Sequence, residues 1–522
     1  MRKQTKIAAV VSAAALLALG ASITSFAAER GTWMLVDGEW YCYDSYGDPY
    51  ENTFCLSNGR EYYVGDDGML VRSQWVEDDG YYYFVNSAGE KITNDWRLTT
   101  PYDDEDAEEQ WYYFQSNGRM AENKKLTIRG NTYFFDSEGT MLTGWVQVND
   151  SDVSEGDADI ATYDGDTYYC DESGARLEGA WVRTYAPEVD EEDADVDDEE
   201  YYYLKSNGEV ATGRRNNISG QTYFFGEDGK MLYGWVAEST SSNGEYEMIW
   251  EYDDDEDGSY DVPLSAYYDT DVYFCGDEMD GHMKRNKWIK LWNNQDYGED
   301  DEDNDEYWFY INSNGTFYIP SGSDATMQKM DFEDGEAENL DEVFTTDGDP
   351  FQGTEKRINS RTYLFDQNGQ MIAGLVQREV NVGTEDAPNV VELMYYYGGD
   401  DDGEMKDGSV SIEDEVGETY RFYFATEENA SDHYHDGAGV NGARSGRLYR
   451  QGLIVTAQDY RYEVKEVNID GTDYEFIVNR SGSIQTSARD YEDDGDVVVP
   501  ADNWTIETNS GAGALRGHII SR

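Results

Sequence analysis

The chain has 522 residues, and its 111 Asp and Glu against 38 Lys and Arg give a formal net charge of −73. Nucleic acids and anionic membrane surfaces are therefore poor partners for this chain, because binding to phosphate needs clustered basic charge. Aromatic residues make up 14% of the chain, with 44 Tyr alone, whereas disordered acidic chains are poor in aromatics. We expect a folded protein that lacks the large aliphatic core of an α/β enzyme.

Residues 1–27 have the pattern of a secretory signal peptide. A basic start is followed by an apolar stretch from Ile7 to Ala21, and Ser25 and Ala27 supply the small residues that precede a cleavage point. The apolar stretch is shorter than the roughly 18–20 residues that a membrane anchor needs. We therefore expect the mature chain to begin at Ala28, to be exported and to have no membrane span.

Beyond this segment, the chain repeats a unit in which an aromatic run precedes a turn that contains glycine. The aromatic run favours a strand, the Asn-Gly or Asp-Gly step favours a tight turn, and a short strand such as Thr140–Leu142 follows. Each unit therefore predicts a β-hairpin. The clear copies cover 81–89, 111–118, 132–139, 167–174, 201–208, 222–229, 307–315 and 362–369, and weaker ones begin near 40, 61, 272, 394, 420 and 473.

The spacing of these units predicts how they are arranged. Gly68 and Gly89 are 21 residues apart, and a second period of 90 relates Trp145 to Trp235. A period of about 20 residues is typical of a stacked repeat array. A single hairpin is only marginally stable in water, so the hairpins must bury their aromatics against one another. We predict an all-β fold, a β-solenoid of stacked hairpins with long acidic loops.

Acidic residues concentrate in runs between the repeats, where we expect solvated loops that lengthen without disturbing the stack. One run has Asp253, Asp255, Asp257 and Asp261 at the spacing of the start of an EF-hand calcium loop. These four residues are the candidate Ca²⁺ ligands, although Leu264 occupies the twelfth position, where a bidentate Glu belongs. No other cofactor is expected.

The sequence contains no catalytic motif that we recognise: no His-Glu-x-x-His, no Gly-x-Ser-x-Gly and no P-loop. The longest stretches without repeats, 316–361 and 425–472, are polar and too short for an ordinary catalytic domain. We therefore predict that the chain is not an enzyme. Its four cysteines are too few for a disulfide scaffold, and the pairing of Cys42 with Cys55 stays open.

The residue pattern of the repeats resembles that of a known family. The segments 132–146 and 222–236 share an aromatic run, Gly, Met-Leu and Gly-Trp-Val, and they look like the cell-wall-binding repeats of choline-binding proteins, glucan-binding proteins and clostridial toxins. The resemblance implies a solenoid of hairpins with ligand sites between successive units. It is clear from about Glu61 to Val376 and becomes degenerate afterwards.

In choline-binding members of this family, the resemblance implies a cage made from the Gly-Trp tryptophan, the first aromatic of a Trp-Tyr-Tyr run and an aromatic of the adjoining repeat. Ring faces attract a quaternary ammonium by cation–π interaction, and flat rings also stack on sugars. Several units have Thr at the first aromatic position, so a more general glycan-binding role is expected beside choline binding. The candidate ligand-binding residues are Trp75, Tyr81, Trp96, Trp111, Tyr112, Trp145, Trp181, Tyr201, Tyr202 and Trp235.

We expect three regions: the signal peptide (1–27), the repeat array with acidic insertions (28–376), and degenerate repeats or a C-terminal cap (377–522). The predicted function is non-catalytic binding of a carbohydrate or teichoic-acid polymer, by an exported protein held non-covalently at a Gram-positive cell wall. One alternative is a structural or adhesive surface protein whose repeats only display acidic loops that bind Ca²⁺. The other is an accessory component of a cell-wall enzyme.

Overall fold

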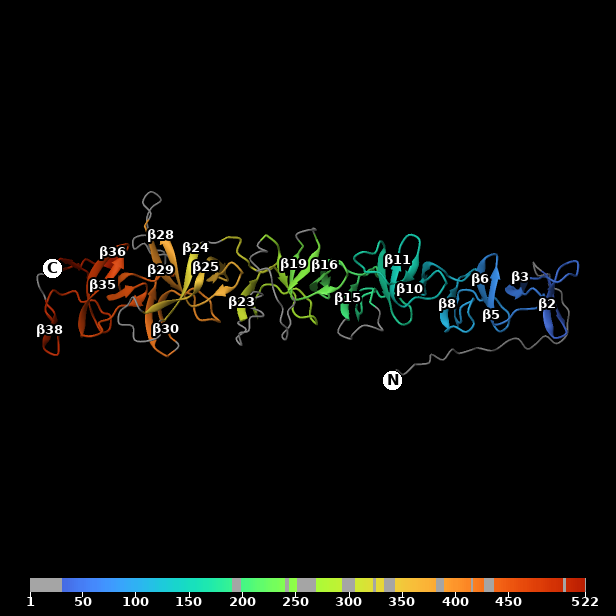
Figure 1. Ribbon diagram of the computed structural model, residues 1–522, viewed down its shortest axis with the longest axis horizontal. Helices are drawn as coiled ribbons and strands as arrows, with labels where there is room; N and C mark the ends of the chain where they lie inside the picture. The colour runs from blue at the N-terminus through green and yellow to red at the C-terminus, as the bar shows by residue number, and fades with distance from the viewer. Residues whose placement is uncertain are drawn as a thin grey trace. The chain divides into compact units, whose positions relative to one another are not determined.

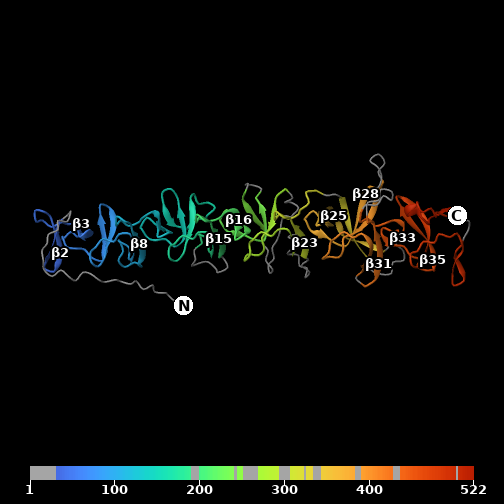
Figure 2. The same ribbon diagram turned by 180° about the vertical axis from the view of Figure 1, so that it is seen from behind.

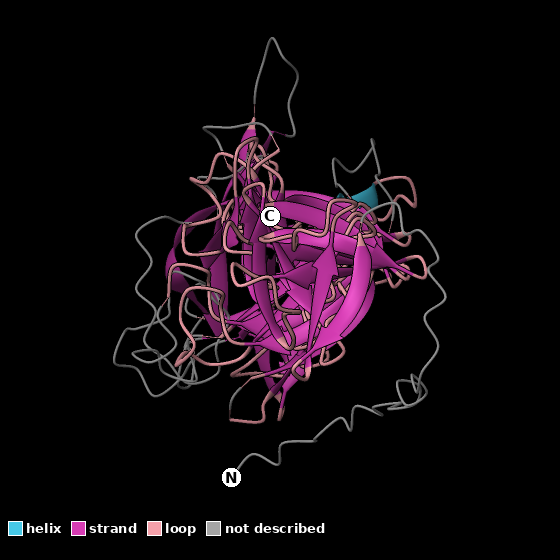
Figure 3. Cartoon of the chain, turned by 90° about the vertical axis from the view of Figure 1, so that its right-hand side faces the viewer, coloured by secondary structure: helices cyan, strands magenta, loops and turns pink. Residues whose placement is uncertain are grey.

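The computed structural model describes residues 31–189, 199–239, 244–250, 269–292, 306–322, 325–332, 343–381, 389–414, 416–426, 436–500 and 504–521. The predicted signal peptide and the candidate Ca²⁺ ligands Asp253, Asp255, Asp257 and Asp261 lie outside these residues. The described chain is built from strands and turns (Figure 3). Its one described helical element is a 3₁₀ turn, η4 (Gly513–Leu515). The predicted all-β fold of hairpins is confirmed.

The chain forms two compact units, which are described separately: Met1–Arg215 with Phe225–Met231, and Asn216–Phe224 with Leu232–Arg522. In the first unit, short antiparallel hairpins follow one another in chain order (Figure 1). Their strands are β1 (Thr32–Val36) with β2 (Glu39–Tyr43), β3 (Thr53–Ser57) with β4 (Arg60–Val64), β5 (Gln74–Asp78) with β6 (Tyr81–Val85), β7 (Asp95–Thr99) with β8 (Gln110–Phe114), β9 (Lys124–Ile128) with β10 (Asn131–Phe135), β11 (Gly144–Val148) with β12 (Val153–Glu155) and β13 (Asp166–Cys170), and β14 (Ala180–Thr184) with β15 (Glu200–Leu204). The strands β16 (Gly213–Ile218), β17 (Gln221–Phe225) and β18 (Met231–Leu232) lie around the division between the units.

The second unit continues with hairpins and adds two larger sheets (Figure 2). One sheet has six strands in the order β27-β26-β25-β24-β28-β29, and the other has five in the order β30-β31-β34-β33-β32. The strands are β19 (Trp235–Glu238), β20 (Tyr246–Trp250), β21 (Val272–Phe274), β22 (Lys287–Trp292), β23 (Glu306–Ile311), β24 (Ala325–Phe332), β25 (Phe344–Ile358), β26 (Arg361–Phe365), β27 (Met371–Ile372), β28 (Leu375–Asn381), β29 (Val390–Tyr396), β30 (Gly408–Glu413), β31 (Thr419–Phe424), β32 (Gly442–Arg444), β33 (Arg447–Arg450), β34 (Leu453–Ile454), β35 (Tyr462–Ile469), β36 (Thr472–Asn479), β37 (Tyr491–Asp493), β38 (Asp496–Val499), β39 (Thr505–Ile506) and β40 (Ile519–Ser521).

The observed hairpin pairs a different strand with the aromatic run than the predicted hairpin does. In the unit around residue 130, the strand that pairs with the aromatic run is β9, which precedes it, and the connecting turn is Arg129-Gly130 with φ of 52° and 97°. These positive angles match the right-handed twist of the strands, as in a type I′ turn. The predicted short strand at Thr140–Leu142 instead bridges two hairpins, because the Met141 N–H donates to the Trp111 carbonyl oxygen (2.9 Å) and the Leu142 N–H donates to that of Phe134 (3.0 Å).

This bridging segment is what stacks successive hairpins in the first unit. After each aromatic strand, a turn is closed by an Asp or Asn side chain: Asp136 accepts hydrogen bonds from the N–H groups of Glu138 and Thr140. Gly139 in this turn has φ of 83°, and a Cβ there would approach the Met120 side chain within 2.5 Å. Both the backbone angle and the close approach therefore require glycine. The same backbone link to the preceding hairpin is made by Leu70, Lys91, Met120, Arg176 and Val210.

The core is divided into separate hydrophobic clusters along the chain, rich in aromatics in the first unit and more aliphatic toward the C-terminal strands of the second. Phe84, Tyr112, Phe114 and Met120 form one such cluster, and none of these side chains exceeds 4% exposure. Stability in such an array is approximately a sum of nearest-neighbour interfaces. The predicted boundary at residue 376 stays a prediction about the regularity of the sequence, since strands are found on both sides of it.

Candidate ligand-binding site

The tryptophans of the hairpins first serve the core. Trp145 on β11 packs against Tyr169, which lies opposite it on β13, and against Tyr202 on β15 of the next hairpin, with ring centroids 5.0 and 4.9 Å apart. Trp235 on β19 packs in the same way against Phe274 and Phe309. Aromatic side chains contribute most of the burial in such small repeats.

Four of the predicted ligand-binding residues lie in these clusters: Trp145 is 8% exposed, Tyr112 is 1% exposed, and Tyr202 and Trp235 are fully buried. Burial raises the pKa of the Tyr112 phenol, and it raises that of Tyr202 further, so both rings are neutral parts of the core. They present no open ring face to a ligand. The other six are half-buried (Trp75, Trp96, Trp181 and Tyr201) or exposed (Tyr81 and Trp111).

The strand register identifies which aromatic stands beside each tryptophan on the same face of its hairpin. In β7 and β8, Trp96 lies opposite Tyr113, and Leu98 lies opposite Trp111, so these four side chains share one face. The same register places an aromatic in this second position in five hairpins, at Trp40, Tyr82, Trp111, Tyr201 and Trp308.

The predicted ligand-binding residues did not include three members of this set, Trp40, Tyr82 and Trp308. A signal for them exists, because each of the five aromatics lies seven residues before the glycine of the following turn: Gly47, Gly89, Gly118, Gly208 and Gly315. Tyr81, which was predicted, lies one residue off this register, opposite Asp78.

Three of the five rings are engaged by other side chains of the chain itself. Tyr82 stacks on Tyr102, with ring centroids 3.9 Å apart and an interplanar angle of 24°. The Arg183 guanidinium lies 5.7 Å from the centre of the Tyr201 ring. The indole N–H of Trp308 donates to Asp401 Oδ1 at 3.0 Å.

Trp111 has the most open ring of the predicted residues, with 44% of the side chain exposed. Its ring is perpendicular to that of Trp96, at an interplanar angle of 88° and a centroid distance of 6.4 Å. Leu98, 39% exposed, lies opposite Trp111, and the ring of Tyr133 from the next hairpin lies 4.9 Å from that of Trp96. Among the described residues, no cation lies over the Trp111 ring. We call Trp96, Leu98, Trp111 and Tyr133 the aromatic corner.

Trp40 is the remaining ring of this register. It is half-buried and lies opposite Leu35, which is 57% exposed. Its neighbouring tryptophan, Trp33, contacts Tyr62 of the next hairpin. The Trp40 hairpin therefore has the apolar rim of the aromatic corner without the perpendicular pair of indoles.

Charged side chains of both signs lie near the aromatic corner, and Arg129 and Asp95 both act on the Tyr113 phenol at its base. Glu108 and Glu109 are exposed and immediately precede β8, and Asp95 at the start of β7 is also exposed. Tyr113, at the base of the corner, donates a hydrogen bond from its hydroxyl to Asn94 Oδ1 (2.7 Å), and burial raises its pKa. The ring faces of the corner can hold an apolar or a cationic group.

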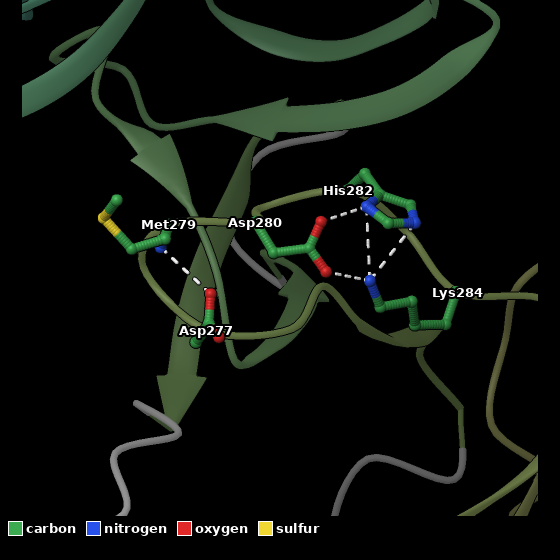
Figure 4. A network of polar contacts seen from close by, with 5 residues as sticks. All are labelled: Asp277, Met279, Asp280, His282 and Lys284. Carbon is green, nitrogen blue, oxygen red and sulfur yellow. Dashed lines mark hydrogen bonds and ion pairs between the residues drawn. The ribbon is translucent and has the colours of Figure 1, made fainter.

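The charged cluster in Figure 4 lies elsewhere, in the second unit, after β21. Asp280 accepts from Lys284 Nζ and contacts His282 Nδ1, and Lys284 Nζ lies 3.2 Å from both ring nitrogens of His282. Within the described part of the chain, no group of three or more His, Cys, Asp or Glu side chains is arranged to hold a metal ion. The described residues also include no helix long and apolar enough to cross a membrane.

A family model described as a putative cell wall binding repeat matches residues 106–120 and 216–231. The first of these segments contains Trp111 and the turn that follows β8. The recognition of cell-wall-binding repeats from the sequence is thus confirmed.

Three curated relatives are similar to parts of this chain. Glucosyltransferase-S of Streptococcus mutans is 31% identical over 202 residues, which is 38% of this chain and 11% of the relative. Glucosyltransferase-I of Streptococcus downei is 24% identical over 66% of this chain and 18% of the relative. A putative endo-beta-N-acetylglucosaminidase of Streptococcus pneumoniae is 26% identical over 24% of this chain and 14% of its own length. The chain thus spans less than a fifth of the length of these relatives.

Among solved structures, the modular autolysin LytC of Streptococcus pneumoniae is 14% identical, with a TM-score of 0.34, over 66% of this chain and 54% of that chain. Choline binding protein F of the same organism is 17% identical, with a TM-score of 0.31, over 77% of this chain and 98% of that chain.

Proposed function

We propose, on the premise that the chain carries cell-wall-binding repeats, that it is a binding protein for a polymer of the bacterial cell envelope. The observation that carries the proposal is the aromatic corner, in which the exposed Trp111 ring stands perpendicular to Trp96 at 6.4 Å. The segment matched by the family model includes Trp111, which supports a binding role for the same residues.

The shape of the aromatic corner favours a quaternary ammonium, such as the choline head group of a wall polymer, as the bound group. Two perpendicular ring faces surround a compact cation, whereas a sugar ring stacks on a single flat face. The exposed Glu108 and Glu109 and the net charge of −73 also favour a cation. Glucosyltransferases are among the relatives of the chain, so glucan is the second candidate ligand.

The proposal includes export and non-covalent retention at the wall, and a non-catalytic role. The signal-peptide pattern of residues 1–27 supports export, and the lack of a recognised catalytic motif in the sequence supports a binding role.

A pull-down of residues 28–522 on purified cell walls tests this function. We expect retention on walls that contain choline and elution by free choline, because the free group competes for the aromatic corner. Elution by soluble glucan and not by choline would assign the site to a sugar. Failure to bind both walls that contain choline and walls that lack it would contradict the proposal.

A matched pair of variants links the retention to the structure. Trp111→Ala removes the exposed ring, and we expect it to lose most of the retention. Tyr201→Ala removes the ring of the same register that Arg183 already covers, and we expect it to keep wild-type retention. Equal losses in both variants would remove the aromatic corner as the site.

A further inference from the structure

The first two hairpins meet at a junction where two cysteines lie together. Cys42 on β2 lies opposite Trp33, and Cys55 on β3 lies opposite Tyr62. The rings of Trp33 and Tyr62 contact each other across the junction, with centroids 5.8 Å apart. Cys42 and Cys55 belong to one buried cluster with Val64, and all three side chains have zero exposure.

The next comparable junction shows what this position ordinarily holds. There, Trp75 contacts Tyr112 with ring centroids 4.9 Å apart, in the same way as Trp33 contacts Tyr62. The residue opposite Trp75 is Phe84, and the residue opposite Tyr112 is Arg97. The Arg97 guanidinium lies 4.8 Å from the centre of the Phe84 ring. The two cysteines therefore occupy the places of a cation–π pair.

Two further junctions in the first unit repeat the arrangement with other large side chains. In both, the tryptophan contacts a tyrosine of the next hairpin at 4.9 Å, and the residues opposite these two rings belong to one hydrophobic cluster. The opposing residues are Tyr113 and Leu126 at the Trp96 junction, and Tyr169 and Val182 at the Trp145 junction. In these three junctions, an aromatic faces Arg, Leu or Val. At the first junction alone among the four, both places are held by cysteine, the residue type that can join them covalently.

The surroundings of the two sulfurs fit a crosslink. The Cys42 and Cys55 side chains hydrogen-bond to each other, and this bond together with burial raises the pKa of the Cys42 thiol. Gly31 packs so closely on Cys42 Sγ that a Cβ at residue 31 would collide with the sulfur. The Cys42 sulfur is thus held between Cys55 and Gly31.

We propose that Cys42 and Cys55 form a disulfide that joins hairpin β1–β2 to hairpin β3–β4. The two thiols lose two protons and two electrons as the S–S bond forms, and an oxidant of the disulfide class, either oxidised glutathione or the disulfide of a thiol oxidoreductase, is reduced to two thiols. In the cell this step depends on export, which is part of the proposed function, because disulfides persist in oxidising compartments.

The crosslink addresses a weakness of this hairpin. Met34, Leu35 and Val36 on β1 are 45%, 57% and 40% exposed, so burial on that side contributes little to holding the hairpin. A disulfide between residues 42 and 55 closes a short loop and reduces the entropy of the open chain. Because both sulfurs are buried, the bond forms before the two hairpins dock, or when they open transiently.

Counting thiols in residues 28–522, refolded with oxidised and reduced glutathione, tests the disulfide directly. After denaturation without reductant, we expect an alkylating agent to label two cysteines, Cys170 and Cys275, and to label all four after reduction. Peptide mapping should find Cys42 joined to Cys55. Labelling of four cysteines before reduction, or a crosslink between other residues, would overturn the proposal.

Variants separate the crosslink from a packing role. Cys170 and Cys275 lie in two other hydrophobic clusters, so the double variant Cys170→Ser with Cys275→Ser should keep the crosslink. Reduction should speed amide hydrogen exchange in β1 and β2 by about 30-fold or more in this variant. The same reductant should change nothing in Cys42→Ser. The thiol count on the wild-type chain decides the matter even if a variant fails to fold, and it does not depend on binding to cell walls.

Discussion

At the scale of single residues, the fate of each aromatic depends on what covers its ring. Tyr82, Tyr201 and Trp308 share the register of Trp111, but Tyr102, Arg183 and Asp401 engage them. The chain therefore fills several of its own aromatic positions with its own side chains. Differences in ligand binding among the repeats follow from these covering groups as much as from the rings themselves.

Removing a covering group should create a site. Arg183→Ala exposes the Tyr201 ring beside Trp181, and we expect this variant to bind a second equivalent of choline more weakly than the aromatic corner does, because the site has one indole and one phenol. Calorimetric titration measures the stoichiometry. The double variant with Tyr201→Ala should return to the wild-type value, and an unchanged stoichiometry in Arg183→Ala would show that the guanidinium does not block a site.

Residue types alone did not reveal these covering groups. The sequence predicted Trp96 and Trp111 as ligand-binding residues, and the structure places their rings together at 6.4 Å. It also predicted Tyr112 and Tyr202, which point into the core because side chains alternate along a strand. A shift of one residue moves a ring from one face to the other, so the assignment needs the strand register, which the offset of seven residues to the turn glycine supplies.

At the scale of the element, the aromatic strand of each hairpin and its turn were predictable, whereas the strand that precedes them was not. Aromatic runs such as Tyr81–Val85 are strong strand formers, whereas their partners, such as Lys124–Ile128 on β9, are polar and have little periodic signal. The stretches 316–361 and 425–472 have no recognisable repeat in the sequence, yet they contain β24, β25 and the strands β32–β35. Tertiary pairing forms these strands without aromatic runs.

The turn after β21 leads to a prediction about how the stability of the fold depends on pH. Burial alone would raise the pKa of Asp280, but hydrogen bonds from Lys284 and His282 outweigh it and lower the pKa below its ordinary value of 3.8. A carboxylate with a lowered pKa stabilises the fold above its unfolded pKa and loses this contribution as the pH falls through the folded pKa. We expect Asp280→Asn to be less stable than the wild type by about 0.5 kcal/mol at pH 6, since the pair is partly exposed.

Thermal denaturation from pH 6 to pH 2 measures this difference. The gap between the wild type and Asp280→Asn should narrow below about pH 4 and close near pH 2. The same Asp280→Asn substitution made in Lys284→Gln, which lacks the donor, should produce a smaller difference in melting temperature across the whole pH range. A gap that stays constant down to pH 2 would show that Asp280 does not contribute as a carboxylate.

At the scale of the whole molecule, the net charge of −73 gives binding a definite dependence on salt. The charge attracts a free cation such as choline, so raising the salt from 10 to 150 mM should weaken choline binding by a few fold as the Debye length falls from about 30 to about 8 Å. A wall polymer with phosphate groups carries negative charge and is repelled, so the same change should strengthen its retention.

Titration with choline and retention on phosphate-containing walls, each at the two salt concentrations, check this pair of opposite trends. Glucose-only polymers serve as the neutral control and should show little change. Parallel trends for choline and the polymer would mean that the overall charge does not govern the approach of the ligand.

The fold of the whole molecule was predictable because it depends on a repeated local rule. Each aromatic strand, turn glycine and bridging segment is visible in the sequence. The backbone hydrogen bonds from Met120 to Tyr82 and from Met141 to Trp111 repeat the same connection between successive hairpins. The six-stranded sheet around β24 was not predictable, since β24 pairs with β28, about 50 residues later in the chain. The candidate Ca²⁺ ligands Asp253, Asp255, Asp257 and Asp261 stay a prediction, because they lie outside the described residues.

Calorimetric titration of residues 28–522 with choline, compared between the wild type and Trp111→Ala, tests the central claim most directly. The account predicts that the wild type binds choline and that Trp111→Ala loses at least about 1 kcal/mol of binding free energy while its melting temperature stays unchanged, because this ring is exposed and outside the core. Trp40→Ala, at the rim that lacks a perpendicular indole, should retain the wild-type affinity. Wild-type affinity in Trp111→Ala would contradict the assignment of the aromatic corner as the binding site.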